Sequence, residues 1–286
     1  MDRSLPRLKH CEGQVLLIIL LVISVLLVVG LSIVSRSVTD IKISQQSQEA
    51  ARALWIAQAE LEKAIKANAS IGTTRDEGLN VEYSVVKSDI SGGEFIFPEK
   101  TNANESVTLW LVPHSETTGE IVAPATPAEY QARLPRKVSL YWAETGKPAL
   151  EATLIYKNAA GNFLFRRYVF DSDFTRADTQ TYFTRASIIG CAPIKGKTLS
   201  FCSGKIDFPA NTIPYLLRLR LLFTATPQFI GAKSEDGKDF PVQGSCFDAM
   251  AKVSESGVTR RLSECRLWQT TPPIFDYLLF SGINIE

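Results

Sequence analysis

Four cysteines in the last third of the chain are the residues best suited to covalent chemistry: Cys191, Cys202, Cys246 and Cys265. An even number of cysteines in an exported segment favours two disulfides. Closeness along the chain favours the pairs Cys191–Cys202 and Cys246–Cys265, each stabilising the fold by about 3 kcal/mol. Free thiols and a zinc site are the alternatives, but no two of these cysteines have the short spacing usual for zinc ligands.

The other chemically active residues form no catalytic pattern. His114 has Ser115 and Glu116 as its neighbours, whereas the members of a catalytic triad converge from distant parts of a chain. We therefore expect a solvent-facing loop histidine. The aspartates of DSDFTRAD (171–178) lack the glycine and the final glutamate of a calcium-binding loop, which favours a solvated turn. The sequence predicts no enzyme, no metal site and no cofactor.

The net charge argues against a general nucleic-acid surface. Nucleic-acid-binding proteins usually carry a clustered basic excess. Here the formal net charge is +1, with 31 basic residues balanced by 30 acidic ones. We therefore expect no nucleic-acid partner.

The strongest structural signal is an apolar run from Gln14 to Val34, 21 residues without a charge or a proline. As a helix this run is about 31 Å long, which matches the apolar thickness of a bilayer. It is longer than the apolar part of a cleaved secretory signal and has no polar face typical of a core helix. The basic excess of leader 1–13 should stay in the cytoplasm. We assign the membrane and assembly surface to this helix, including Val15, Ile18, Leu21, Val25, Gly30 and Val34.

The helix is expected to continue through residues 35–70, which contain neither glycine nor proline and are rich in strong helix formers. A single helix over 14–70 would be roughly 80 Å long. Its second half carries an apolar stripe that should pack on a globular head. The residues of this predicted stripe are Leu54, Ala57, Leu61 and Ile65. A stalk with a coiled-coil spacer is the alternative.

Residues 71–286 change to short alternating stretches separated by turn residues, which predicts a β-rich antiparallel head. The predicted strands are 81–88, 106–112, 137–143, 151–158, 162–170, 215–225 and 258–269. NAAGN (158–162) is a predicted hairpin turn, and 124–135 is the best candidate for a loop or boundary. The size of the head leaves room for an inserted subdomain. The predicted fold class is therefore α+β.

The N-terminal region resembles type IV pilins and the pseudopilins of type II secretion. The shared features are a basic leader ending in glycine, an apolar helix start and a long amphipathic continuation. GLSIVSRSVTDIKISQ (Gly30–Gln45) and QEAARALWIAQAELEKAI (48–65) resemble PilX-like minor pilins, and the likeness covers Glu12–Lys66. The resemblance implies that a prepilin peptidase cuts between Gly13 and Gln14 and that Gln14 becomes an N-methylated first residue.

One residue departs from the pattern of the major pilins. The resemblance places a glutamate at the fifth mature position, where it is thought to pair with a neighbour's amino terminus. The fifth residue after Gly13 is Ile18. An unpaired buried charge is costly, so a subunit without this acid cannot make the usual pairing. Some minor subunits also lack it, which favours a minor or tip role.

The resemblance implies a single-pass protein of the cytoplasmic membrane with a cytoplasmic N-terminus and an extracytoplasmic head in a surface filament. The implied partners are the membrane, sister pilin or pseudopilin subunits, the prepilin peptidase and the pilus assembly machinery. The tail 268–282 resembles the C-terminal ends of some PilX-like proteins and is expected to pack on the head. The rival is a non-polymerising single-pass protein with an adhesive or ligand-binding head, which would keep residues 1–13.

Overall fold

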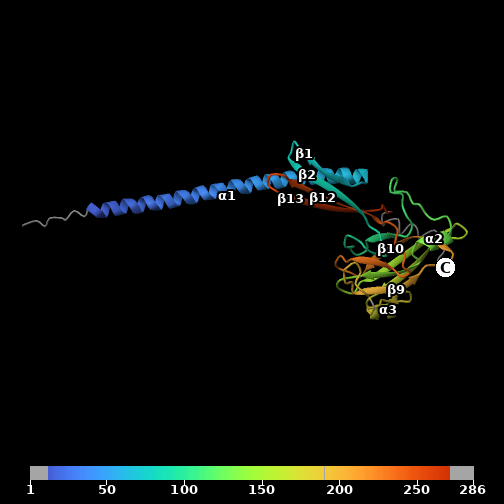
Figure 1. Ribbon diagram of the computed structural model, residues 1–286. Coiled ribbons are helices and arrows are strands. Elements are labelled where there is room, and N and C mark those ends of the chain that lie inside the picture. The colour runs from blue at the N-terminus through green and yellow to red at the C-terminus, as the bar shows by residue number, and fades with distance from the viewer. Residues whose placement is uncertain (1–11, 190, 271–286) are drawn as a thin grey trace, which may run out of the picture. The chain divides into compact units, whose positions relative to one another are not determined.

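A computed structural model describes residues 12–189 and 191–270, with side chains from Leu16 onward. It shows the predicted α+β fold, a long N-terminal helix followed by antiparallel sheets (Figure 1). The described chain divides into two compact units. The first unit comprises 12–60, Thr73–Ser84 and Ala249–Leu262. The second comprises Leu61–Gly72, Val85–Asp248 and 263–270.

Three sheets contain the strands. The first has the order β1-β2-β12-β13, the second β4-β10-β6-β7-β8 and the third β3-β11-β5-β9. The strand bounds are β1 Ile71–Asp76, β2 Val81–Asp89, β3 Glu94–Ile96, β4 Ser106–Trp110, β5 Lys137–Trp142, β6 Ala149–Asn158, β7 Phe163–Asp171, β8 Thr184–Arg185, β9 Phe201–Asp207, β10 Thr212–Leu222, β11 Ile230–Ser234, β12 Gly244–Val253 and β13 Thr259–Leu267. The helices are α1 Glu12–Ala67, α2 Pro127–Arg133 and α3 Phe174–Thr179.

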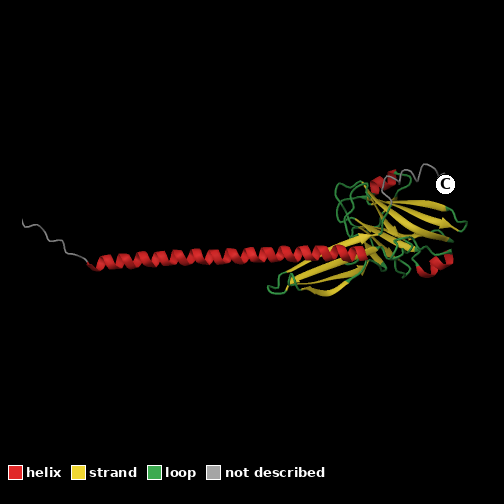
Figure 2. Ribbon diagram, turned by 90° about the horizontal axis from the view of Figure 1, so that it is seen from above, coloured by secondary structure: helices red, strands yellow, loops and turns green. Residues whose placement is uncertain are grey.

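Helix α1 is continuous in Figure 2 and has 56 residues, as its lack of proline predicts. It ends at Ala67, earlier than the predicted end at residue 70. Asn68 adopts a left-handed conformation with φ 48°, and the Ala69 amide donates to the Ala64 carbonyl at 3.1 Å. This geometry is a common way to satisfy the last carbonyls of a helix.

In the first unit, the buried residues of α1 are Ala53, Ala57 and Glu60. Ala53 and Ala57 are fully buried, as is Val81 of β2, and the Arg52 guanidinium donates to the Leu79 carbonyl at 3.4 Å. The predicted stripe began at Leu54, but Leu54 is 40% exposed, so the buried side begins at Ala53 instead.

The last part of α1, from Leu61 onward, belongs to the second unit and also has buried residues. Leu61 is 5% exposed and Ala64 is fully buried, while Ile65 is half-buried. Of the predicted stripe, Ala57 and Leu61 are therefore buried and Ile65 lies at the margin. The fully buried residues of α1 are alanines 53, 57 and 64, and Glu60 and Leu61 beside them are 8% and 5% exposed.

Enlarging Ala57 should weaken this packing. We expect Ala57→Leu to lower the free energy of unfolding by about 1–3 kcal/mol, because a larger side chain overpacks a fully buried position. Ala59 lies two residues away on the exposed side, so Ala59→Leu should change stability by less than about 0.5 kcal/mol. Urea unfolding of the full chain in detergent measures both. Equal losses for the two variants would contradict the assignment of the buried side.

The core of the second unit lies between its two sheets. Leu150, Leu154 and Leu217 of one sheet share an apolar cluster with Leu140 and Trp142 of the other. Trp142 is fully buried, and its indole donates to the Pro148 carbonyl at 3.0 Å. The second unit is therefore a sandwich of two β-sheets with one shared core.

Two turn regions show where local sequence patterns succeed and fail. The NAAGN hairpin is confirmed: it joins β6 to β7, with the Asn158 amide donating to the Asn162 carbonyl at 2.9 Å. The loop prediction for 124–135 is wrong in part, because this segment contains α2. Thr126 caps α2 by accepting from the Glu129 amide, and Pro127 begins the helix.

Candidate functional site

The candidate functional site is the exposed N-terminal half of α1. By length and composition, this helix contains a segment able to cross a membrane, and the most apolar part of that segment has no buried residue. Large apolar side chains are exposed on every side of it. The exposed fractions are 57% for Ile18, 58% for Leu21, 53% for Val25 and 60% for Val34. These side chains require an apolar environment that the rest of the described chain does not provide.

The polar side chains in and beside this run are satisfied within the helix. The Ser24 hydroxyl donates to the Leu21 carbonyl at 2.8 Å, and the Thr39 hydroxyl donates to the Ser35 carbonyl at 2.9 Å. Such bonds remove the cost of placing a hydroxyl in an apolar environment. Nothing lies within 4 Å of a side chain built on Gly30, so this glycine makes no close contact inside the chain.

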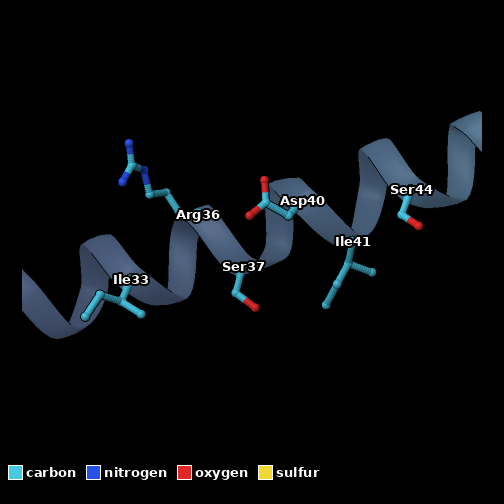
Figure 3. Close-up of a pocket in the computed structure, with 6 residues that line it drawn as sticks. All are labelled: Ile33, Arg36, Ser37, Asp40, Ile41 and Ser44. Carbon is cyan, nitrogen blue, oxygen red and sulfur yellow. The ribbon is translucent and has the colours of Figure 1, made fainter.

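The first charges after the apolar run lie on one side of α1. Arg36 and Asp40 are four residues apart and project to the same side in Figure 3. Ile33, Ser37, Ile41 and Ser44 lie on the same face of the helix and line a shallow hollow together with these two residues. Residues four apart are neighbours on a helix surface, so the two charges are placed to attract each other. This pair was not predicted from the sequence, although its four-residue spacing is visible there.

The predicted processing junction lies in the first turn of α1. The helix begins at Glu12, so Gly13, Gln14 and Val15 have helical backbone. Their side chains are outside the described part of the structure, as is the rest of the leader, residues 1–11. The structure therefore places this junction directly before the exposed apolar segment.

The four cysteines of the head form the two predicted disulfides, Cys191–Cys202 and Cys246–Cys265. Cys202 is 5% exposed and belongs to a small apolar cluster with Tyr141 and Leu199. Cys265 lies on the edge strand β13 and is exposed. Disulfides persist in oxidising compartments, which supports an extracytoplasmic head.

His114 is not the solvent-facing residue that the sequence predicted. Its imidazole packs edge-on to Trp110, with ring centres 4.5 Å apart, and stacks on Trp268 at 5.2 Å. Burial lowers the pKa of His114, because a charged imidazole is poorly solvated there. The side chain therefore contributes apolar packing in its neutral form. Trp268 lies far away in the sequence, so no local pattern could reveal this contact.

The aspartates of 171–178 each have a structural partner. Asp171 is fully buried and accepts two hydrogen bonds from the Arg176 guanidinium, both at 2.6 Å. Asp173 caps α3, and Asp178 pairs with Arg185. Pairing with Arg185 lowers the pKa of Asp178. The predicted solvated turn is therefore wrong in part, because Asp171 is fully buried and the segment contains α3, Phe174–Thr179.

Within residues 12–189 and 191–270, no group of three or more histidine, cysteine, aspartate or glutamate side chains is arranged to hold a metal ion. In comparisons with known proteins, the chain matches no protein-family model, no curated protein and no solved structure.

Proposed function

We propose that this chain is a minor pilin or pseudopilin, a structural subunit that waits in the cytoplasmic membrane and assembles into a filament through α1. The architecture is compatible with such a subunit: a long apolar N-terminal helix precedes a β-rich, disulfide-bonded head. The observation that carries the proposal is the exposed half of α1, which is apolar on every side. Such a surface can be buried by lipid before assembly and by sister helices afterwards.

Processing would release the helix for assembly. In this proposal, prepilin peptidase cuts between Gly13 and Gln14 and removes the basic leader. The leader holds the chain in the membrane because its charges disfavour extraction into an apolar filament. After cleavage, the first charge along α1 is Arg36, more than 20 residues from the new terminus. Ile18 at the fifth mature position supports a minor role rather than that of the main shaft subunit.

A peptidase assay tests this proposal. When the full chain is made in membranes with a prepilin peptidase, its N-terminus should change from Met1 to Gln14, as measured by intact mass and N-terminal sequencing. Gly13→Val should stay uncut, because a branched side chain at the junction blocks access to the peptide bond. Gly30→Val is the matched control and should be cut normally, since its side chain meets nothing within 4 Å.

The same assay separates the proposal from its rival. A non-polymerising protein anchored by the same helix would keep residues 1–13 in cells that process a known prepilin. That outcome would overturn the proposed function. Cleavage of the wild-type chain and of Gly30→Val, with Gly13→Val resistant, would support it.

A further inference from the structure

One line of residues along α1 carries no charge, although charged residues lie on either side of it. Its members recur at alternating spacings of four and three residues. They are Gly30, Val34, Ser37, Ile41, Ser44, Gln48, Ala51 and Trp55. We call this line the α1 seam. Two contact positions in every seven residues are typical of a helix that pairs with another helix as a coiled coil.

The α1 seam lies on the other side of the helix from the residues that pack in the first unit. Ala53 and Ala57 are fully buried, whereas Trp55 between them in the sequence is 70% exposed. Two residues along a helix correspond to a rotation of about 200°, so Trp55 points away from both alanines. Val34 and Ile41 are also exposed, at 60% and 55%. The seam is therefore accessible to a partner while α1 keeps its packing within the first unit.

Lipid cannot cover the whole seam. Trp55 comes 21 residues after Val34, the last residue of the apolar run, which is about 31 Å along a helix. When the apolar run fills the bilayer, Trp55 therefore lies well outside it. An exposed tryptophan at that position indicates a protein contact, because tryptophan is enriched among the residues that dominate binding at interfaces. A partner that covers both ends of the seam must run along α1 from the membrane outward.

We propose that this partner is α1 of a second copy of the chain, and that the two helices form a parallel coiled coil along the seam. Two copies inserted in the same direction run parallel, so residues with the same number lie opposite each other. Gln48 then faces its own equivalent. An amide both donates and accepts hydrogen bonds, which makes this polar position of the seam complementary to itself. A single buried polar residue of this kind fixes the register of a coiled coil.

The seam alternates between small and large side chains, which suits a close pair of helices. The small members are Gly30, Ser37, Ser44 and Ala51, and the large members are Val34, Ile41, Gln48 and Trp55. Small side chains let two backbones approach, and the large side chains fill the layers between them. The shallow hollow in Figure 3 lies on this line, because Ser37, Ile41 and Ser44 all line it.

The charges beside the seam do not oppose the pairing. In a parallel coiled coil, a residue on one flank faces the residue about five positions later on the opposite flank of the partner helix. Asp40 then faces Gln45, and Ser47 faces Arg52. Neither layer brings like charges together, and both can form a hydrogen bond across the pair. A second copy is therefore compatible with the seam along its whole length.

The pairing goes beyond the proposed function, because it requires neither leader cleavage nor growth of a filament. The uncut chain should already be a dimer in the membrane. Experiments on the uncut chain, without a prepilin peptidase, therefore test the pairing alone. Their outcome is the same whether or not the peptidase recognises Gly13.

Cysteine cross-linking in membranes tests the contact surface in the full chain with Cys11→Ser as background. Ser44→Cys lies on the seam, and mild oxidation should convert it to a disulfide-linked dimer. Gln46→Cys is the matched control, because Gln46 is also exposed but lies two residues away, on the other side of α1. We expect at least about fivefold more dimer for Ser44→Cys than for Gln46→Cys.

A charge at Gln48 tests the register. Gln48→Glu places two carboxylates opposite each other, so the dimer Kd in detergent, measured by sedimentation equilibrium, should rise about tenfold or more. Gln46→Glu makes the same chemical change off the seam and should leave the Kd within about twofold. Both positions are exposed, so neither variant should disturb folding.

Four results would each overturn the proposal. They are a wild-type chain that stays monomeric, equal cross-linking of Ser44→Cys and Gln46→Cys, cross-links only to other membrane proteins, and equal Kd values for Gln48→Glu and Gln46→Glu. A seam-specific cross-link between two copies, together with a dimer that only Gln48→Glu weakens, would support it.

Discussion

Gly244→Ala is expected to lower the free energy of unfolding by about 4 kcal/mol, because backbone strain and steric overlap act together. Gly244 has φ 153°, a conformation that residues with side chains rarely adopt. A Cβ atom at this position would lie 2.1 Å from the Arg266 carbonyl oxygen and 2.6 Å from the Leu267 Cα. These are backbone atoms, so the overlap cannot be relieved by rotating a side chain. Urea unfolding of the full chain in detergent measures the loss.

Gly72→Ala is the matched control in the same unit. Nothing lies within 4 Å of a Cβ atom at Gly72, and its φ is outside the strained range. This variant should therefore change stability by less than about 0.5 kcal/mol. If the Gly244→Ala variant were as stable as the Gly72→Ala variant, the close approach of β12 to the end of β13 would be wrong.

Removing the Cys246–Cys265 disulfide should cost about 3 kcal/mol, because it closes a long loop in the unfolded chain. The two cysteines are 19 residues apart and connect β12 to the edge strand β13. Replacing both by serine avoids a free thiol. The matched pair is Cys191→Ser with Cys202→Ser, whose separation is only 11 residues and whose loss should cost somewhat less.

The two disulfides should also differ in their order of reduction. Thiol–disulfide exchange requires access to a sulfur atom. Cys265 is exposed, whereas Cys202 is 5% exposed. Under graded dithiothreitol at neutral pH, mass spectrometry of alkylated peptides should show the Cys246–Cys265 bond opening first. Opening of Cys191–Cys202 first would contradict the described burial.

The helix could be predicted from the sequence because its signal is local. A run without proline, first apolar and then rich in alanine and glutamate, predicts helix at every position. Its buried side could not be predicted with the same accuracy. Hydrophobicity favoured Leu54, whereas the structure buries Ala53 and leaves Leu54 40% exposed. A hydrophobic pattern favours large apolar residues and therefore does not predict which small residues a helix buries.

The strands show the same limit. β5 and β7 lie within one residue of their predicted segments, because β-branched and aromatic residues are frequent in both, whereas β10 begins and ends three residues before its predicted bounds. β12 was missed, although Phe247, Ala249 and Val253 face the buried side at alternate positions. Its alanine and methionine residues favour helix by composition. Pairing with two neighbouring strands overrides that preference.

Part of the candidate site could likewise be predicted from the sequence, and part could not. The exposed apolar segment and the disulfide pairs follow from composition and sequence separation. The packing of His114 against Trp268 does not. These two residues are far apart in the sequence, and a single sequence carries no record of such contacts.

The buried alanines of α1 restrict which heads can be joined to this helix. Ala53 and Ala57 are fully buried in the first unit, which also contains strand segments 73–84 and 249–262. A chimaera that joins this helix to a foreign head should fold stably only if the new strands pack against small side chains at these two positions. We therefore expect a stable chimaera when segments 73–84 and 249–262 are transferred together with the helix.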